Sequence, residues 1–542
     1  MSSTRSAGWL LVMGTLSGWG LFAVKLAISF VRVRVLLNSL PDAAAGIWFT
    51  MLTLLAYVQM FDFGTGVTLA RYLAYARGGK FPQNWHPGET GTGLEPEQQV
   101  VADLVATVGR YFRTLGAVVL ALFLGGGLLY LPTLADGPLS ASMTWTWVIM
   151  ALAAFLTLEG FTYTAAIYGS NGVHVRDSVF AVTMLVGFGL MLLFLRLGWG
   201  LVGVSLSLLI ETGLRLLLLR LALMNMNPFL RLANAGRAQW PLLRQMIGPS
   251  VRMGVVMVAE ILILQTDNVI IATRLGPAAV PNYNVAYQLG FTLFSLMLVV
   301  NAPLVALAAK AYVEQDNQRL RNMLGVNMRF GFALMLLGAA LLASFGDDVI
   351  ALWVGAERFV GFPVLWLILL VMVFESFKVF HFRLVTATDS IPFVPWAVVA
   401  VALNLALSYF LAPRWGWLGV TFGTLASQAI TLYWYVPYHT ARAMKFELRE
   451  YARLVVPVVG FGFAVTAAAL AVSYGLDLTA AGGRPLIHLL AGSLLIALPA
   501  LLVHYRFILL ASERAYLRDR AAVVLGRVHP VLRAIHSSTG PR

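Results

Sequence analysis

Charged side chains that lie inside long apolar runs are the residues of this sequence most able to do chemistry. They are Lys25, Asp62, Glu159, Glu211, Glu260, Asp267 and Glu375. A charge at the centre of a bilayer costs about 2.5–3.5 kcal/mol or more, so such residues usually face a wet cavity or a charged partner. Spacings of four residues (Glu211 and Arg215) and three residues (Glu375 and Lys378) favour ion pairs within one helix. The remaining charges are candidates for contacting a charged ligand or gating its path.

The runs that carry these charges are long enough to cross a membrane. The composition is 59% hydrophobic and 11% charged, whereas an ordinary soluble domain is about 25% charged. Since about 20 mainly apolar residues make one spanning helix, the sequence predicts an all-α integral membrane protein with about 14 transmembrane helices. Many spans around a polar interior, with little chain outside the membrane, are typical of transporters. The predicted helices are Trp9–Val33, Ala43–Arg71, Thr114–Leu131, Met143–Tyr168, Val179–Leu195, Leu197–Leu221, Val251–Ala272, Tyr283–Lys310, Met328–Phe345, Val364–Ala387, Phe393–Leu411, Trp417–Pro437, Val455–Tyr474 and Leu486–Tyr505.

Positive charge orients the bundle. Lys and Arg accumulate on the cytoplasmic side of membrane proteins, and most of the 38 in this chain fall on the side that holds both termini. We therefore expect a multi-pass protein of the inner (cytoplasmic) membrane with both termini in the cytoplasm. The net charge of +14 then indicates contact with anionic membrane lipids rather than with nucleic acid. Because the chain has no cysteine, it has no disulfide or thiolate metal site, and no metal or cofactor is expected.

The chain contains an internal repeat. The segment Leu40–Trp48 (LPDAAAGIW) reappears as Leu275–Tyr283 (LGPAAVPNY), and each joins a charged helix to a following helix of similar length. An even number of spans separates the copies, so they form parallel repeats, which place a substrate site between two lobes. The predicted parts are an N-terminal lobe (1–225), a C-terminal lobe (226–440), helices 13 and 14 (441–510) and a basic cytoplasmic tail (511–542). Within the tail, Glu513–His536 is typical of a helix that lies on the membrane surface.

The repeat aligns residues of opposite charge. Lys25 corresponds to Glu260 and Arg32 to Asp267, and the seven-residue spacing puts each copy's two charges on one helix face. If both faces line a cleft, Lys25–Glu260 and Arg32–Asp267 are gating pairs that form across it in one state and separate in another. The alternative is that each charge pairs within its own lobe.

A break in the second predicted helix draws attention to Asp62. This carboxylate directly precedes Gly64-Thr-Gly66, a sequence that interrupts a helix. Broken helices near the middle of the membrane expose backbone groups to substrates or ions, which makes Asp62 a candidate coupling or gating residue. The alternative is a carboxylate that satisfies a neighbouring backbone or basic group.

Several motifs carry a family resemblance. Gly46-Ile-Trp48 and the following segment Phe61–Arg71 (FDFGTGVTLAR) resemble the second-helix signature of the polysaccharide and O-antigen flippases. The second copy, Thr266–Ile271 (TDNVII) through Asn282–Tyr287 (NYNVAY), is similar to the start of their second lobe, and Ala351–Gly355 (ALWVG) to a short outer motif. This family belongs to the multidrug/oligosaccharidyl-lipid/polysaccharide exporter superfamily. The resemblance covers most of residues 8–440.

The resemblance implies a fold and a function. The fold would be a V-shaped bundle of two six-helix lobes plus two C-terminal helices. By alternating access it would move a polyprenyl-diphosphate-linked oligosaccharide from the inner to the outer leaflet, for surface polysaccharide synthesis beside a polymerase and chain-length machinery. Fourteen spans also match the lipid II flippase branch. Arg32 and Arg34, however, come later in the first helix than the arginines of that branch.

A diphosphate head group needs cations along its path, because hydrocarbon strongly disfavours unpaired charge. The candidate cations are Lys25, Arg71, Arg252 and Lys310, with Arg32 and Arg34 on the exit side. Arg71 and Lys310 end their helices at nearly equivalent repeat positions and so belong to the inner mouth. Charges at inner helix ends are also ordinary determinants of topology.

Two other classes of function stay open. A cation-coupled multidrug antiporter of the same superfamily would favour an acidic, aromatic cavity, against which the basic first helix argues. An integral-membrane glycosyltransferase or ligase would need a sizeable outer loop with catalytic carboxylates, but the outer loops are short and their acids, such as Asp136, Asp347 and Asp348, have no basic or metal-ligating companions. The chain also lacks the G-x-x-x-x-G-K-[ST] motif for nucleotide phosphates. We therefore expect a transporter that does not use ATP, and not an enzyme.

Overall fold

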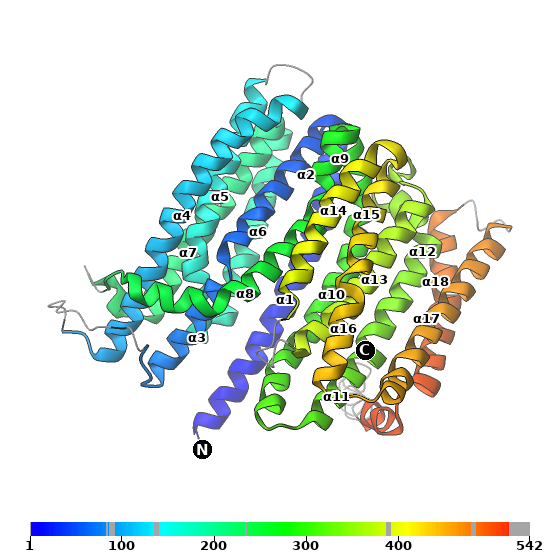
Figure 1. The fold of residues 1–542 in the computed structure, drawn as a ribbon. Helices are drawn as coiled ribbons and strands as arrows, with labels where there is room; N and C mark the ends of the chain where they lie inside the picture. Colours follow the sequence, from blue (N-terminus) through cyan, green and yellow to red (C-terminus); the bar gives the residue numbers. More distant parts are fainter. Residues whose placement is uncertain are drawn as a thin grey trace, which may run out of the picture. The chain divides into compact units, whose positions relative to one another are not determined.

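The described part of the chain is helical. The computed structural model describes residues 2–82, 85, 93–134, 140–232, 236–385, 392–478 and 484–519. Helices and their connecting turns make up these residues, and no strand occurs among them (Figure 1). The predicted all-α class is therefore confirmed.

The helices follow one another in the order that the apolar runs predict, with short connections. Those that correspond to the first six predicted helices are α1 (Ser2–Ser39), α2 (Asp42–Ala56), η1 (Tyr57–Asp62), α3 (Thr65–Arg77), α4 (Pro96–Leu134), α5 (Ala141–Gly169), α6 (Val173–Arg196) and α7 (Gly200–Met226). The next are η2 (Pro228–Arg231), α8 (Trp240–Gln265), α9 (Asp267–Leu275), η3 (Pro277–Ala279), α10 (Val280–Val313), α11 (Asn317–Val326), η4 (Asn327–Phe332) and α12 (Ala333–Trp353). The last are η5 (Ala356–Arg358), α13 (Phe362–Val385), α14 (Val394–Trp415), α15 (Trp417–Ile430), α16 (Leu432–Ala443), α17 (Leu448–Asp477), α18 (Pro485–Val503) and η7 (His504–Ile508).

Many of these helices can span a membrane. Among the described residues, ten are long and apolar enough to cross a bilayer, or eleven when the bent pair α8 and α9 counts as one span. The chain is therefore a multi-pass membrane protein, while the number of fourteen spans stays a prediction.

The second predicted helix is broken where its glycines predict a break. Phe63 and Gly64 both adopt left-handed backbone angles, with φ of 42° and 73°, and they separate η1 from α3. A non-glycine residue rarely adopts this conformation, so the break at Phe63 is held by its surroundings. The Asp62 side chain stabilises this break by accepting hydrogen bonds from the first residues of α3, as described below.

Two other predicted helices are interrupted where the sequence gives no glycine or proline signal. The predicted helix Val251–Ala272 is bent, because α8 and α9 meet at Thr266 at an angle of 41°. The predicted helix Trp417–Pro437 is divided at Thr431, whose φ of −117° and ψ of −82° are not helical. Thr266 is buried and its hydroxyl lies 2.8 Å from the Tyr57 hydroxyl, so the bend is accompanied by a contact with a distant residue rather than by a local signal.

The chain divides into two compact units. The first contains Met1–Thr292, Trp353–Met372 and Asp389–Tyr438, and the second contains Leu293–Leu352, Val373–Thr388 and His439–Arg542. Within the first unit, α5 packs on α4 and α7, α6 packs on α1 and α7, and α14 packs on α8 and α15 (Figure 1). The predicted division into an N-terminal and a C-terminal lobe stays a prediction.

The two predicted pairs within helices are confirmed. Arg215 and Glu211 form an ion pair one turn apart on α7. Lys378 Nζ lies 2.7 Å from Glu375 Oε2 on α13, and both side chains are buried. Burying such a pair stabilises the fold little, since desolvation offsets the attraction, but removing one partner is costly.

A buried carboxylate on α4 joins two loop segments of the first unit. Asp103, on α4, accepts hydrogen bonds from the Trp85 indole (2.9 Å), from the Arg237 backbone amide (2.7 Å) and from the side chains of Gln99 and Gln239 (3.0 Å each). Trp85 belongs to the loop before α4, whereas Arg237 and Gln239 precede α8. The Asp103 side chain therefore links the loop before α4 to the segment before α8, and Trp85 and Arg237 of these segments are 152 residues apart in the chain.

The two helices outside the repeat are joined to α12 by a buried ion pair. His488 of α18 lies 2.5 Å from Asp348 of α12 and 3.6 Å from Asp477 of α17. The sequence-based statement that Asp348 has no basic companion was therefore wrong, because 140 residues separate the partners. In the tail, residues 511–519 are helical and Glu513 forms an ion pair of 2.7 Å with Arg329. The rest of the predicted surface helix lies outside the described residues.

Candidate functional site

A pocket beside α1 contains two of the predicted cations. It has a volume of about 330 Å³ and lies within the first unit. Lys25, Ser29 and Arg32 of α1 line one side, and the opposite side carries amide side chains of the second copy. Those amides are Gln265, Asn268, Asn284 and Gln288. We call this cavity the α1 pocket.

Polar contacts join the two copies around the α1 pocket. The Gln288 amide donates to Ser29 Oγ at 2.8 Å, and the Asn268 amide donates to Thr53 Oγ1 at 3.2 Å and to Asn284 Oδ1 at 3.3 Å. These are neutral hydrogen bonds, and each is worth about 0.5–1.5 kcal/mol. The wall is thus polar without adding negative charge.

Lys25 has no carboxylate partner among the described residues. Its ammonium group lies 6.0 Å from the centre of the Phe180 ring, on α6. The same ring is approached by Arg176 at 5.7 Å and by Arg215 at 4.7 Å. A cation over an aromatic face is stabilised by about 0.5–2 kcal/mol. The Phe180 ring therefore stabilises the nearby cations without neutralising their charge.

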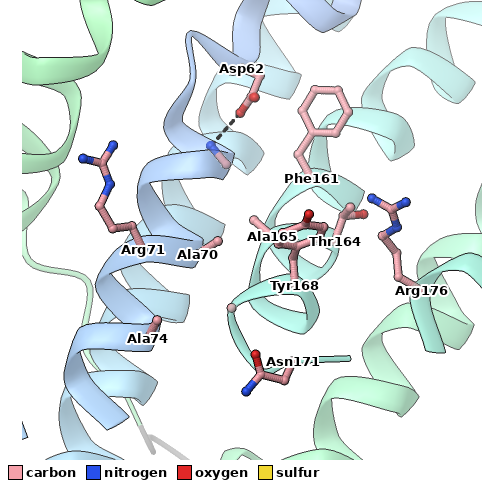
Figure 2. A pocket seen from close by; sticks show the side chains of 12 residues that line it. Asp62, Ala70, Arg71, Ala74, Phe161, Thr164, Ala165, Tyr168, Asn171 and Arg176 are labelled. Carbon is pink, nitrogen blue, oxygen red and sulfur yellow. Dashed lines mark hydrogen bonds between the residues drawn. The ribbon is translucent and has the colours of Figure 1, made fainter. Parts of the chain in front are cut away.

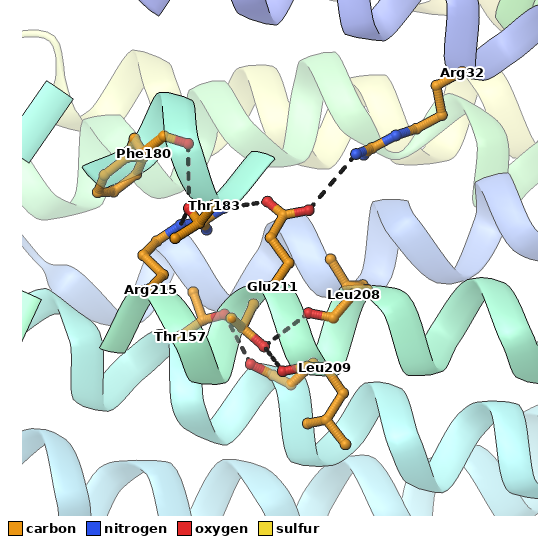
Figure 3. Close-up of polar contacts among 10 residues, drawn as sticks. Arg32, Thr157, Phe180, Thr183, Leu208, Leu209, Glu211 and Arg215 are labelled. Atoms are coloured by element: carbon orange, nitrogen blue, oxygen red, sulfur yellow. Dashed lines mark hydrogen bonds and ion pairs between the residues drawn. The ribbon is translucent and has the colours of Figure 1, made fainter. Parts of the chain in front are cut away.

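Arg32 forms an ion pair with a residue of its own repeat copy. Arg32 and Arg215 share the carboxylate of Glu211, and the Arg32 guanidinium lies 3.6 Å from that carboxylate (Figure 3). Arg215 also donates to Thr183 Oγ1 at 3.3 Å. In this structure the partner of Arg32 is therefore Glu211, as in the alternative that each charge pairs within its lobe.

The sequence reasoning missed an arginine and a carboxylate on α6. Arg176 donates to Asp177 Oδ1 from Nε (2.9 Å) and Nη2 (2.5 Å), and Ser17 donates to Asp177 Oδ2 at 3.0 Å. Asp177 is only 2% exposed. Its position near the start of a predicted helix gave no sign of burial, and Ser17 is 160 residues away.

Together these residues form what we call the cationic cluster. Its members are Lys25, Arg32, Arg176, Arg215, Asp177 and Glu211. Four cations against two carboxylates leave a net charge of +2 beside a partly apolar wall. Such a cluster attracts a polyanion, and arginine in particular suits bidentate contact with phosphate.

Asp267 lies in a separate, fully enclosed network. Its carboxylate accepts hydrogen bonds from the Tyr283 hydroxyl at 2.5 Å and from Thr424 Oγ1 at 3.2 Å. The Asn404 amide donates to Thr424 at 2.9 Å, so α9, α10, α14 and α15 all contribute. The predicted Arg32–Asp267 pair is not formed in this structure and stays a prediction for another state.

A larger pocket lies beside α3. It has a volume of about 600 Å³ and is lined by residues of α3, α5 and the start of α6, including Asp62, Arg71 and Arg176 (Figure 2). Asp62 Oδ1 accepts hydrogen bonds from the Gly66 amide (2.8 Å) and from Thr65 Oγ1 (3.0 Å). Asp62 therefore caps α3, in agreement with the alternative of a carboxylate that satisfies nearby backbone. We call this cavity the α3 pocket.

Two further predicted site residues, Glu260 and Arg34, are not among the residues that line either pocket. Glu260 is partly buried on α8, and Arg34 is exposed on α1. Arg252 lies in α8 and Lys310 in α10, but their side chains fall outside the described part of the structure.

The two copies of the repeated segment touch each other within the first unit. Gly46 of α2 lies so close to Pro277 of η3 that a Cβ atom on Gly46 would overlap the Pro277 carbonyl. Nearby, Arg358 forms an ion pair of 2.7 Å with Asp42 and a hydrogen bond of 3.3 Å with Asn282. These contacts join the two copies at the end of the unit that we expect to face outward.

Comparison with known proteins places the fold. No family model matches the chain. Over 184 residues, it is 25% identical to a Salmonella typhimurium (strain LT2) protein named "Putative O-antigen transporter". The alignment covers 33% of this chain and 42% of that protein, so the chain spans less than half of the length of the relative.

Solved structures match over most of their length. An inward-facing multidrug resistance MATE family transporter of the MOP superfamily has a TM-score of 0.58 at 15% identity, covering 78% of this chain and 95% of its own. The lipid II flippase MurJ, in an inward closed conformation, has a TM-score of 0.58 at 13% identity, covering 89% and 98%. A Vibrio cholerae MATE transporter has a TM-score of 0.56 at 15% identity, covering 83% and 100%. The chain thus has the MATE and MurJ fold, and it resembles the O-antigen transporter branch.

Proposed function

We propose that the chain is a flippase that moves a polyprenyl-diphosphate-linked oligosaccharide from the inner to the outer leaflet for surface polysaccharide synthesis. The observation that carries this proposal is the cationic cluster, which has a net charge of +2 and of which Lys25 and Arg32 line the α1 pocket. Lys25 forms no ion pair with a described carboxylate. A diphosphate brings two or more negative charges, which this cluster would partly neutralise. The names of the O-antigen transporter and of MurJ agree with such a substrate.

The geometry suggests how access would alternate. Gly46–Pro277 packing and the Asp42–Arg358 pair close one end of the first unit. We propose that these contacts separate when substrate is released, and that Asp267 or Glu260 couples the change to an ion. The sequence lacks the G-x-x-x-x-G-K-[ST] motif for nucleotide phosphates. The energy for transport would therefore come from an ion gradient, the membrane potential or consumption of the product.

Reconstituted protein provides the direct test of the function. Proteoliposomes are loaded with a labelled prenyl-diphosphate-linked disaccharide in the inner leaflet, and its appearance outside is followed with an impermeant lectin. We expect transfer that requires the protein and is absent with a prenyl-monophosphate-linked disaccharide of equal chain length, which the lectin also detects. Ethidium transport without lipid transfer would instead support the alternative of a multidrug antiporter; one structure with this fold is that of a multidrug resistance MATE family transporter.

The proposed orientation gives an independent expected result. Cysteine placed at Lys80 should be labelled by an impermeant maleimide only after the membrane is permeabilised, whereas cysteine at Glu357 should be labelled in intact cells. Both residues are exposed, and the chain has no other cysteine to react. Labelling of residue 80 in intact cells would invert the orientation and the direction of transport.

A further inference from the structure

The α3 pocket has the size and walls of a small-molecule site. Its volume of about 600 Å³ falls in the range of about 300–1,000 Å³ that is typical of ligand pockets. Small residues and two aromatic rings make most of its lining (Figure 2). These residues are Gly66, Ala70, Ala74, Ala165, Gly169, Phe161 and Tyr168.

One side of the α3 pocket holds a fixed guanidinium group. Arg176 is bound to the buried Asp177 through Nε and Nη2, which leaves Nη1 for a ligand. Its guanidinium also lies 5.7 Å from the ring centres of Tyr168 and Phe180. An arginine fixed in this way loses little conformational entropy when it binds an anion.

The other residues of the pocket add a second cation and hydroxyl acceptors. Arg71 forms no ion pair or hydrogen bond with any described residue, and Figure 2 shows it on the opposite side of the group from Arg176. Asp62 uses only Oδ1 to cap α3, so Oδ2 accepts no hydrogen bond within the described part of the chain. A carboxylate oxygen accepts hydrogen bonds from hydroxyl groups, whereas arginines bind phosphate. Asn171 adds an amide.

We propose that the α3 pocket binds a sugar ring that carries a phosphate, with the phosphate at Arg176 and ring hydroxyls at Asp62 and Asn171. A plain phosphate site would not place a carboxylate in the same cavity. The inference rests on the proposed function, which supplies such a group as the sugar attached to the lipid diphosphate. The α3 pocket would then select the first sugar near the inner face, while the α1 pocket carries the diphosphate across.

Binding to the purified full-length protein in phosphatidylcholine nanodiscs tests this proposal. The probes are geranyl-diphosphate-N-acetylglucosamine, geranyl diphosphate and phosphatidylglycerol. We expect Arg176→Gln to weaken binding of the sugar-bearing probe by about tenfold or more, since it removes a charge-assisted contact. Asp62→Asn should weaken binding of that probe alone, because geranyl diphosphate has no hydroxyl to donate. Arg220→Gln, an exposed change on α7, is the matched control and should bind as wild type.

The outcomes separate the inference from the function. If wild type binds the sugar-bearing probe and both Arg176→Gln and Arg71→Gln bind it equally well, the α3 pocket is not the sugar site, although the flippase proposal survives. If phosphatidylglycerol competes as well as the sugar-bearing probe, the site is an ordinary phospholipid head-group site and the inference fails. If wild type binds neither diphosphate probe, the proposed function itself is wrong. Arg71 is exposed, so its variant remains informative should Arg176→Gln not fold.

Discussion

Replacing Lys25 with alanine is expected to abolish export of the surface glycan while leaving folded protein in the membrane. Lys25 forms no ion pair with a described carboxylate, and the buried carboxylates Asp177 and Glu211 keep their arginine partners when Lys25 is removed. A lost hydrogen bond to a charged group costs about 1.5–3 kcal/mol, or about 10- to 100-fold in rate if the loss is felt at the barrier. The measurement is lipid transfer in proteoliposomes at equal protein content.

Conservative and structural variants make this result interpretable. Lys25→Arg keeps the cation and should retain part of the activity. Arg220→Ala removes an exposed arginine of α7 that is outside the cationic cluster, and it should transport as wild type. Equal transport by Lys25→Ala, Lys25→Arg and wild type would show that Lys25 does not neutralise the phosphates.

Introducing a side chain at Gly46 is expected to prevent the contact between the two copies. The Pro277 carbonyl occupies the position that a Cβ atom would take, and a backbone group cannot rotate out of the way as a side chain can. For Gly46→Val we expect transport to fall about tenfold or more, since overpacking of this kind costs about 1–3 kcal/mol. A cysteine at Ala44 should also react faster with an impermeant maleimide than in wild type.

Gly125→Val serves as the control for Gly46→Val. Gly125 is a helical glycine of α4 with no atom near the position of an added Cβ, so the variant should transport normally. If Gly46→Val transports as fast as wild type, closure of this end is not part of the transport cycle.

The sequence predicts those parts of the structure that depend on local pattern. Long apolar runs gave the helices, and spacings of three and four residues gave the pairs of Glu375 and Glu211 with their basic partners. The glycines after Asp62 gave the break before α3. Each of these features is decided by residues within a few positions of one another.

Features that depend on distant residues could not be predicted in this way. Asp177 is buried because Ser17 and Arg176 supply donors, and the bend at Thr266 carries no local breaker. The repeat aligned Arg32 with Asp267, and their pairing stays a prediction; in this structure Arg32 lines a pocket together with Gln288 of the second copy. The repeat could not show that Glu211 lies nearer than Asp267, because it relates positions and not contacts.

The hydrogen bonds to Asp103 have a consequence for how the protein opens locally. Trp85 and the Arg237 amide donate to the same buried acceptor, and the backbone amide of Gln239, close to Arg237, also donates to Thr107 Oγ1 at 3.0 Å. Release of either Trp85 or the segment before α8 removes a donor from a buried carboxylate, which costs free energy. Local opening at these two distant places is therefore coupled through Asp103, and a change at Asp103 would loosen both at once.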